Sequence, residues 1–108
     1  MAEMDSSEPR KPLEIAREAV QQKMLHYSHR AESILAEQHW QRANAALAAI
    51  ANAMTNRDNV AFLNSLNTFT NLAGGPPYNH DEELFLIGDE IPTLAQAYWD
   101  LKYPEQSQ

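Results

Sequence analysis

The sequence predicts an all-α protein, a small helical bundle of four to five helices with short connections. Between Pro12 and Asn56 the chain has no glycine and no second proline, and it is rich in residues that lose little on entering a helix. Apolar residues recur every three or four positions along most of the chain, as one face of a helix requires. Neither the alternation of a β-strand nor a two-residue hairpin turn occurs in the sequence.

Residues 12–56 are expected to form two helices with a short break near Glu37 to His39. The apolar stripe shifts to a rotated face at this point: it runs through Leu13, Ala16, Val20, Met24, Tyr27, Ala31, Ile34 and Leu35, and then through Trp40, Ala43, Leu47, Ile50 and Met54. An unbroken helix of this length would span about 66 Å, roughly twice the width of a compact domain of this size. A single long helix is the alternative if the protein dimerises along it.

The helix over residues 58–73 has the clearest boundaries. Asp58 is placed to accept the free N–H groups of the first turn as an N-cap. The run Gly74-Gly75-Pro76-Pro77 is expected to end the helix, because glycine can take a positive φ and the prolines cannot continue a helix.

The last helical segment is expected as a kinked pair, about 82–88 and then about 90–103. The acidic run at 81–83 supplies a cap and charges that favour a helix N-terminus. The apolar stripe continues across Pro92, which fits the first turn of a second helix capped by Asp89.

The domain organisation is expected to be a disordered tail at residues 1–11 and a single helical domain at residues 12–104. The tail mixes charges, serines and a proline without periodic apolar residues, so it buries too little surface to offset the entropy of ordering. The N-terminal segment also lacks the apolar core of a secretion signal. We therefore expect a cytoplasmic protein.

The sequence offers little catalytic chemistry. The chain has no cysteine, which removes thiolate nucleophiles and Cys-based metal sites. It also lacks a Gly-x-Ser-x-Gly elbow and a glycine-rich phosphate loop, and capping explains its clustered carboxylates. We expect no enzymatic activity and no cofactor.

His26 and His29 are the one pair with metal-ligand spacing, since residues three apart on a helix face the same way. A metal-binding bundle that uses these histidines is one hypothesis. A solvated face beside Lys23 and Arg30 is the simpler interpretation, so no metal is expected.

Charge is distributed unevenly along the chain. Residues 1–42 hold seven acids and six bases, residues 43–80 hold only Arg57 and Asp58, and residues 81–108 hold seven acids and Lys102. An uncharged polar face is typical of the centre of an interface, and alanines let a neighbouring backbone come close. We expect a homodimer whose contact includes Ala46, Asn64, Asn67 and Asn71; a solvent-exposed Asn-rich helix and alanines packed in the core are the alternatives.

The acidic C-terminal third predicts a surface for a basic protein partner. Clustered charge accelerates encounter, while aromatic residues supply lasting affinity. The candidate partner-binding residues are Tyr98, Trp99, Tyr103, Glu82, Glu83 and Glu90. The competing interpretation places Trp99 in the core.

These observations favour a non-enzymatic protein–protein interaction module, acting as an adaptor, assembly factor or inhibitor on a macromolecular, basic partner. The alternative is a helical small subunit of a nucleoprotein assembly in which neighbours supply the basic surface. A net charge of −7 argues against direct nucleic-acid binding. The lack of a long apolar segment argues against a membrane partner.

Overall fold

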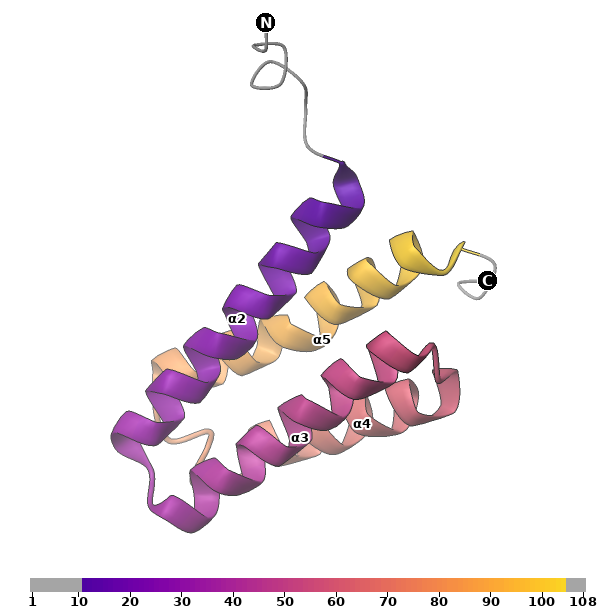
Figure 1. The fold of residues 1–108 in the computed structure, drawn as a ribbon. Helices are drawn as coiled ribbons and strands as arrows, with labels where there is room; N and C mark the ends of the chain where they lie inside the picture. The colour runs from indigo at the N-terminus through magenta and orange to yellow at the C-terminus, as the bar shows by residue number, and fades with distance from the viewer. Residues whose placement is uncertain (1–10, 105–108) are drawn as a thin grey trace, which may run out of the picture.

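The computed structural model describes residues 11–104, which form four α-helices and no strand (Figure 1). The predicted all-α bundle is confirmed for this part of the chain, with four helices rather than five. The tail expected at residues 1–11 lies outside the described residues except for Lys11. The helices are α2 (Pro12–Ile34), α3 (Glu37–Asn56), α4 (Asn59–Ala73) and α5 (Glu82–Lys102).

The bundle consists of two antiparallel helix pairs, α2 with α5 and α3 with α4. The two pairs are splayed, since α2 and α3 diverge from their short connection and α5 runs back between α2 and α4 (Figure 1). Each pair is amphipathic and turns its apolar side inward. Each helix therefore packs against two others.

Large aromatic side chains fill the space where the two pairs meet. Trp99 stacks on Phe62, with ring centroids 4.4 Å apart, and Tyr27 meets Phe69 edge to face at 5.1 Å. The largest fully buried side chains are Trp99, Tyr27, Phe62, Phe69, Ile50, Leu84, Ile91 and Val20. One continuous apolar core thus joins all four helices.

The break between the first two helices lies at Leu35 and Ala36, two residues before the predicted position. Both residues have extended backbone, with ψ near 157°. The Leu35 N–H still donates to the Ala31 carbonyl, while the N–H groups of His39 and Trp40 donate to Ala36. The rotation of the apolar stripe therefore indicated the break correctly, and the break falls at the last residue of the first stripe.

The predicted N-caps of α4 and α5 are confirmed. Asp58 accepts from the Ala61 N–H at 3.1 Å, and Asp81 accepts from the Leu84 N–H at 2.9 Å. Each carboxylate satisfies one of the donors that a helix N-terminus leaves free.

The expected positive φ at the end of α4 is wrong. Gly74 has φ −82° and its N–H donates to the Thr70 carbonyl, so the helix ends in ordinary right-handed backbone before the two prolines. The left-handed residue is instead Arg57, with φ 57°, at the end of α3. Its conformation turns the chain sharply into α4.

The predicted division of the last segment into two helices is also wrong, because α5 is one helix with Pro92 inside it. Pro92 cannot donate to the carbonyl four residues earlier, which costs the helix one hydrogen bond. Ile87, Ile91 and Ala95 are buried on both sides of the proline, so packing against α2 and α4 holds the helix together. Asp89 lies within the helix and is not a cap.

Among the helices of residues 11–104, none is both long and apolar enough to cross a membrane.

Candidate interaction surfaces

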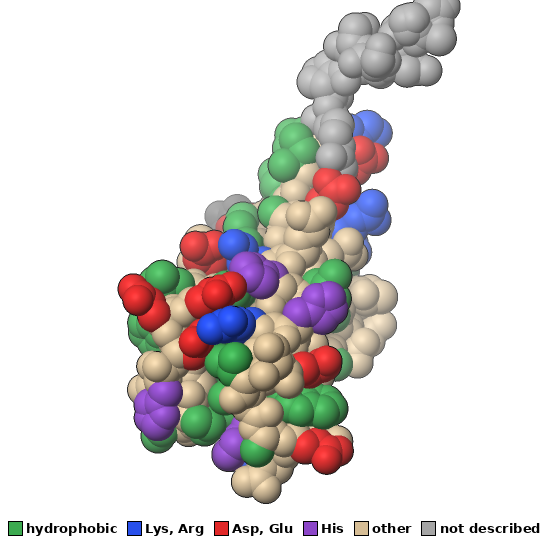
Figure 2. All heavy atoms as spheres, turned by 90° about the vertical axis from the view of Figure 1, so that its left-hand side faces the viewer, with side chains coloured by type: hydrophobic (Ala, Val, Ile, Leu, Met, Phe, Trp, Pro, Cys, Tyr) green, Lys and Arg blue, Asp and Glu red, His purple; other side chains and the backbone are tan. Residues whose placement is uncertain are grey.

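Acidic residues of α5 and its N-cap contact basic and histidine side chains of α2. Lys23 Nζ lies 2.8 Å from Glu90 Oε1, and His26 Nε2 lies 3.1 Å from Glu83 Oε2. At the end of the series Arg30 contacts Asp81. The charged and histidine side chains of this face gather over the α2 and α5 helices (Figure 2). Two of the predicted partner-binding acids, Glu83 and Glu90, are thus engaged within the chain itself.

Arg30 and Asp81 form the best-aligned pair of this series. The guanidinium donates from Nη2 to Oδ1 at 2.8 Å and from Nε to Oδ2 at 3.0 Å. The hydrogen bond from Arg30 and the Leu84 N–H lower the pKa of the Asp81 carboxyl, and the same bond raises the pKa of Arg30. One carboxylate therefore caps α5 and ties its N-terminus to the end of α2.

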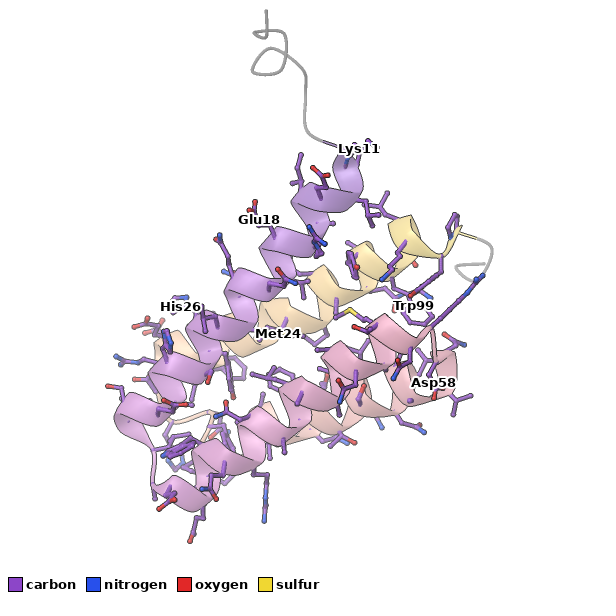
Figure 3. All side chains as sticks on the ribbon, in the orientation of Figure 1. Lys11, Glu18, Met24, His26, Asp58 and Trp99 are labelled. Carbon is purple, nitrogen blue, oxygen red and sulfur yellow. The ribbon has the colours of Figure 1, made fainter. Side chains whose placement is uncertain are left out.

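The predicted aromatic cluster lies in the core and not on the surface. Trp99 is 1% exposed and Tyr98 and Tyr103 are 7% exposed. Trp99, labelled in Figure 3, lies on the side of α5 that faces α4, where it stacks on Phe62. The Tyr103 hydroxyl donates to the Met54 carbonyl at 2.6 Å. Of the two interpretations of Trp99, the structure shows the core one.

Tyr98 and Trp99 are adjacent on α5, so their side chains point in different directions. Both are buried, because α5 lies between two helices. Tyr98 faces the first half of α2, where it shares a cleft with Arg17, while Trp99 faces α4.

The predicted self-association residues lie on and beside a shallow groove between α3 and α4. The groove has a volume of about 600 Å³ and is lined by Arg42, Ala45, Ala46, Ala49, Thr68, Asn71 and Leu72. The structure thus brings Ala46 and Asn71 together, but Ala46 is buried and packs in the core, as the alternative for the alanines expected. Asn64 and Asn67 are exposed and share a side of α4 with Asn71 by their spacing.

Sequence reasoning missed two sets of residues. Ala45 and Ala49 are spaced four apart after Arg42, and this spacing alone could have indicated one wall of the groove. Arg17 and Lys102 line a common cleft between α2 and α5, although they are far apart in the chain. No local pattern could have joined them.

The histidine pair does not extend to a larger ligand cluster. His26 is engaged by Glu83, and His29 is exposed. Across residues 11–104, no three His, Asp or Glu side chains converge in a way that could hold a metal ion.

Comparison of the chain with protein-family models, with curated protein sequences and with solved structures gives no match.

Proposed function

We propose that the chain is a non-enzymatic protein–protein interaction module that self-associates through the α3–α4 groove. The observation that carries the proposal is the groove itself, an open surface of about 600 Å³ whose lining residues include one charged side chain, Arg42. The centres of protein interfaces are depleted in charge in the same way.

Charge favours a second copy of the chain as the occupant of the groove. Residues 81–108 carry a net charge of −6, so two copies that met through α5 would repel each other. Residues 43–80 carry only Arg57 and Asp58, which cancel. The α3–α4 side is therefore where two copies of this acidic chain meet at the lowest electrostatic cost.

The side chains of this face suit close contact between helices. Ala45 and Ala49 are exposed and small, so a neighbouring helix backbone can approach α3. Val60 is 69% exposed and lies, by its spacing, on the same side of α4 as the asparagines. It adds apolar surface beyond the groove. A symmetric dimer would bury the same patch on both copies.

A basic partner remains part of the proposal, with the acids of α5 as its contact and the chain acting as adaptor, assembly factor or inhibitor. Glu82 is exposed, and the side chains of Glu83 and Glu90 keep 50% and 57% exposure despite their ion pairs. The negative charge of residues 81–108 supports electrostatic steering of such a partner. The buried Trp99 is not part of this surface.

Light scattering coupled to size-exclusion chromatography tests the self-association. The unmodified chain at high micromolar concentration should show about twice its monomer mass of 12.2 kDa. Ala49→Arg and Asn67→Arg should each give a monomer, because they place a charge on the contact face. Ala97→Arg, an exposed alanine on α5, is the matched control and should remain dimeric. A monomeric unmodified chain, or dimers of all three variants, would overturn the proposal.

A further inference from the structure

The contacts between charged side chains of α2 and α5 do not extend to the end of the helix pair that holds the start of α2 and the end of α5. Lys23 and Arg30 of α2 pair with Glu90 and Asp81, and His26 between them lies within hydrogen-bond distance of Glu83. One and a half turns before Lys23, Arg17 shares its surroundings with Tyr98 and Lys102 and not with a carboxylate of α5. Within residues 11–104, none of the ion pairs that join α2 to α5 includes Arg17 or Lys102. Arg17 of α2 and Lys102 of α5 therefore line the same cleft at this end of the pair.

A cleft of about 230 Å³ lies between these two cations, where α2, α3 and α5 meet. Its lining residues are Arg17, Val20, Gln21, Met24, Ala51, Met54, Thr55, Tyr98 and Lys102. Figure 3 labels Met24 on the side of α2 that faces this space. The set contains no acid, so the cleft combines two positive charges with a lining of mixed apolar and polar side chains.

Lys102 is held in place beside the cleft. Its ammonium lies 5.5 Å from the centroid of the Tyr98 ring and 5.4 Å from that of Tyr103. Such cation–π contacts favour the charged form. A hydrogen bond to the Tyr98 side chain is also the main cause of a raised pKa of Lys102. The ammonium is therefore charged and positioned before any ligand arrives.

The interior of the cleft suits a flexible apolar chain. Val20 and Met54 are buried and Met24 is half-buried. Methionine side chains are unbranched and polarisable, so they adapt to aliphatic groups of varied shape. A site with a few polar groups above an apolar interior is typical for a small amphiphilic ligand.

A neighbouring cavity extends the charged end of the cleft. This second cavity, of about 310 Å³, shares Arg17, Tyr98 and Lys102 with the first and adds Lys11, Leu13 and Glu14. The Lys11 ammonium and the Glu14 carboxylate offset each other, so the two shared cations, Arg17 and Lys102, leave this cavity with a net positive lining as well.

We propose that this cleft binds an amphiphilic monocarboxylate, with its carboxylate between Arg17 and Lys102 and its aliphatic chain between Val20, Met24 and Met54. The carboxylate of the ligand would pair with Arg17 in the way that Glu90 of α5 pairs with Lys23. Arginine and lysine form charge-assisted hydrogen bonds with carboxylates, and burial of the aliphatic chain adds a hydrophobic contribution.

The test is a titration of the ¹⁵N-labelled chain with decanoate below its micellar concentration, at constant ionic strength. Amide shifts should saturate and concentrate in residues 17–24, 51–55 and 98–102. Acetate, which has the head group only, and decanol, which has the chain only, should each bind at least about tenfold more weakly, as the loss of one of the two contributions implies.

Two variants and one control locate the carboxylate. Arg17→Gln should weaken decanoate binding about tenfold, which corresponds to the loss of one charge-assisted hydrogen bond, and Lys102→Gln should do the same. Arg17 is exposed, so its variant keeps the fold even if Lys102→Gln disturbs the tyrosine contacts. Arg42→Gln removes an exposed cation from the α3–α4 groove and should leave the affinity unchanged.

Three results would overturn the proposal: no saturable binding of decanoate, equal binding of decanol, or unchanged affinity in Arg17→Gln. Shifts confined to the α3–α4 groove would also overturn it. The molar mass of the free chain does not depend on this cleft, so failure here leaves the self-association proposal standing.

Discussion

The ring of Tyr27 in α2 lies against Gly88 in α5, so closely that a Cβ at Gly88 would stand 2.9 Å from Tyr27 Cε2. The same Cβ would stand 3.3 Å from the Cβ of Ala73, at the end of α4. Three helices therefore meet at a glycine inside a helix, where its backbone conformation is ordinary and only its lack of a side chain is needed. This explains why a residue of low helix propensity occupies the middle of α5.

Gly88→Ala should destabilise the fold. Overpacking of a core costs about 1–3 kcal/mol, whereas alanine gains about 1 kcal/mol in helix propensity, so the free energy of unfolding should fall by up to about 2 kcal/mol. Urea denaturation should show a lower midpoint with an unchanged slope. Gly75→Ala is the control, because its Cβ would meet only carbonyl oxygens at 3.7 and 3.8 Å. Equal midpoints for Gly88→Ala and the unmodified chain would show that the space between Tyr27 and Gly88 accommodates a methyl group.

Tyr27→Phe should stabilise the fold. The Tyr27 hydroxyl is buried and has no hydrogen-bond partner among the described residues. A buried, unsatisfied hydroxyl costs about 1–3 kcal/mol in desolvation, so its removal should raise the free energy of unfolding by about 1 kcal/mol. Thermal unfolding measures the change. A loss of stability would indicate that the hydroxyl has a partner, such as a bound water.

The same substitution should flatten the alkaline limb of the stability curve. Burial, with a smaller contribution from Tyr78, raises the pKa of Tyr27 above its ordinary value of 10.0. Above about pH 10 the unfolded chain therefore releases this proton while the folded chain keeps it, so stability falls as pH rises. Tyr27→Phe should lose less stability than the unmodified chain between neutral and strongly alkaline pH. An equal loss of stability with rising pH in Tyr27→Phe and the unmodified chain would contradict the attribution of this loss to Tyr27.

Local signals predicted most of the fold. Asp58 and Asp81 cap α4 and α5 as expected, because an N-cap depends on residues within one turn. The continuity of α5 across Pro92 could not be predicted, since it depends on packing against α2 and α4, which are distant in the sequence. Local propensity favoured a break, and tertiary contacts outweighed it.

The candidate surfaces were harder to predict for a similar reason. An acid near a helix start can face water, a partner or a cation of the same chain. Glu83 pairs with His26 across 57 positions, which no local pattern reveals. Trp99 likewise has its stacking partner, Phe62, on another helix. The low charge of the α3–α4 residues is visible in the sequence itself, but the groove that Ala46 and Asn71 line depends on how α3 packs against α4.

Asp81→Asn should flatten the acid limb of the stability curve. The hydrogen bond from Arg30 lowers the pKa of Asp81 below its ordinary value of 3.8, so this carboxylate contributes stability above that pH and loses it as the pH falls through its folded-state pKa. Asparagine keeps the N-cap but removes the charge. Urea midpoints, followed from about pH 7 down to about pH 2 across the ordinary range of carboxyl titration, should therefore converge for the two proteins at low pH. A difference between the two urea midpoints that stays the same across that pH range would contradict the prediction.

Trp99→Ala should be the most damaging substitution of the four. Trp99 stacks on Phe62 and meets Tyr103 edge to face with ring centroids 4.6 Å apart, so its removal leaves a cavity between α4 and α5. Truncation of a buried tryptophan costs about 3–5 kcal/mol, a large share of the roughly 5–15 kcal/mol that typically stabilises a domain. The melting temperature should drop sharply, or the chain should lose its cooperative transition.

Trp40→Phe separates this effect from the general loss of a tryptophan, because Trp40 is only partly buried and packs at the margin of the core. Its variant should lose much less stability and should retain the fluorescence of Trp99, which reports on the core. If Trp99→Ala instead kept the melting temperature and weakened only the capture of a basic protein, Trp99 would belong to a binding surface, and the position of α5 between α2 and α4 would have to be revised.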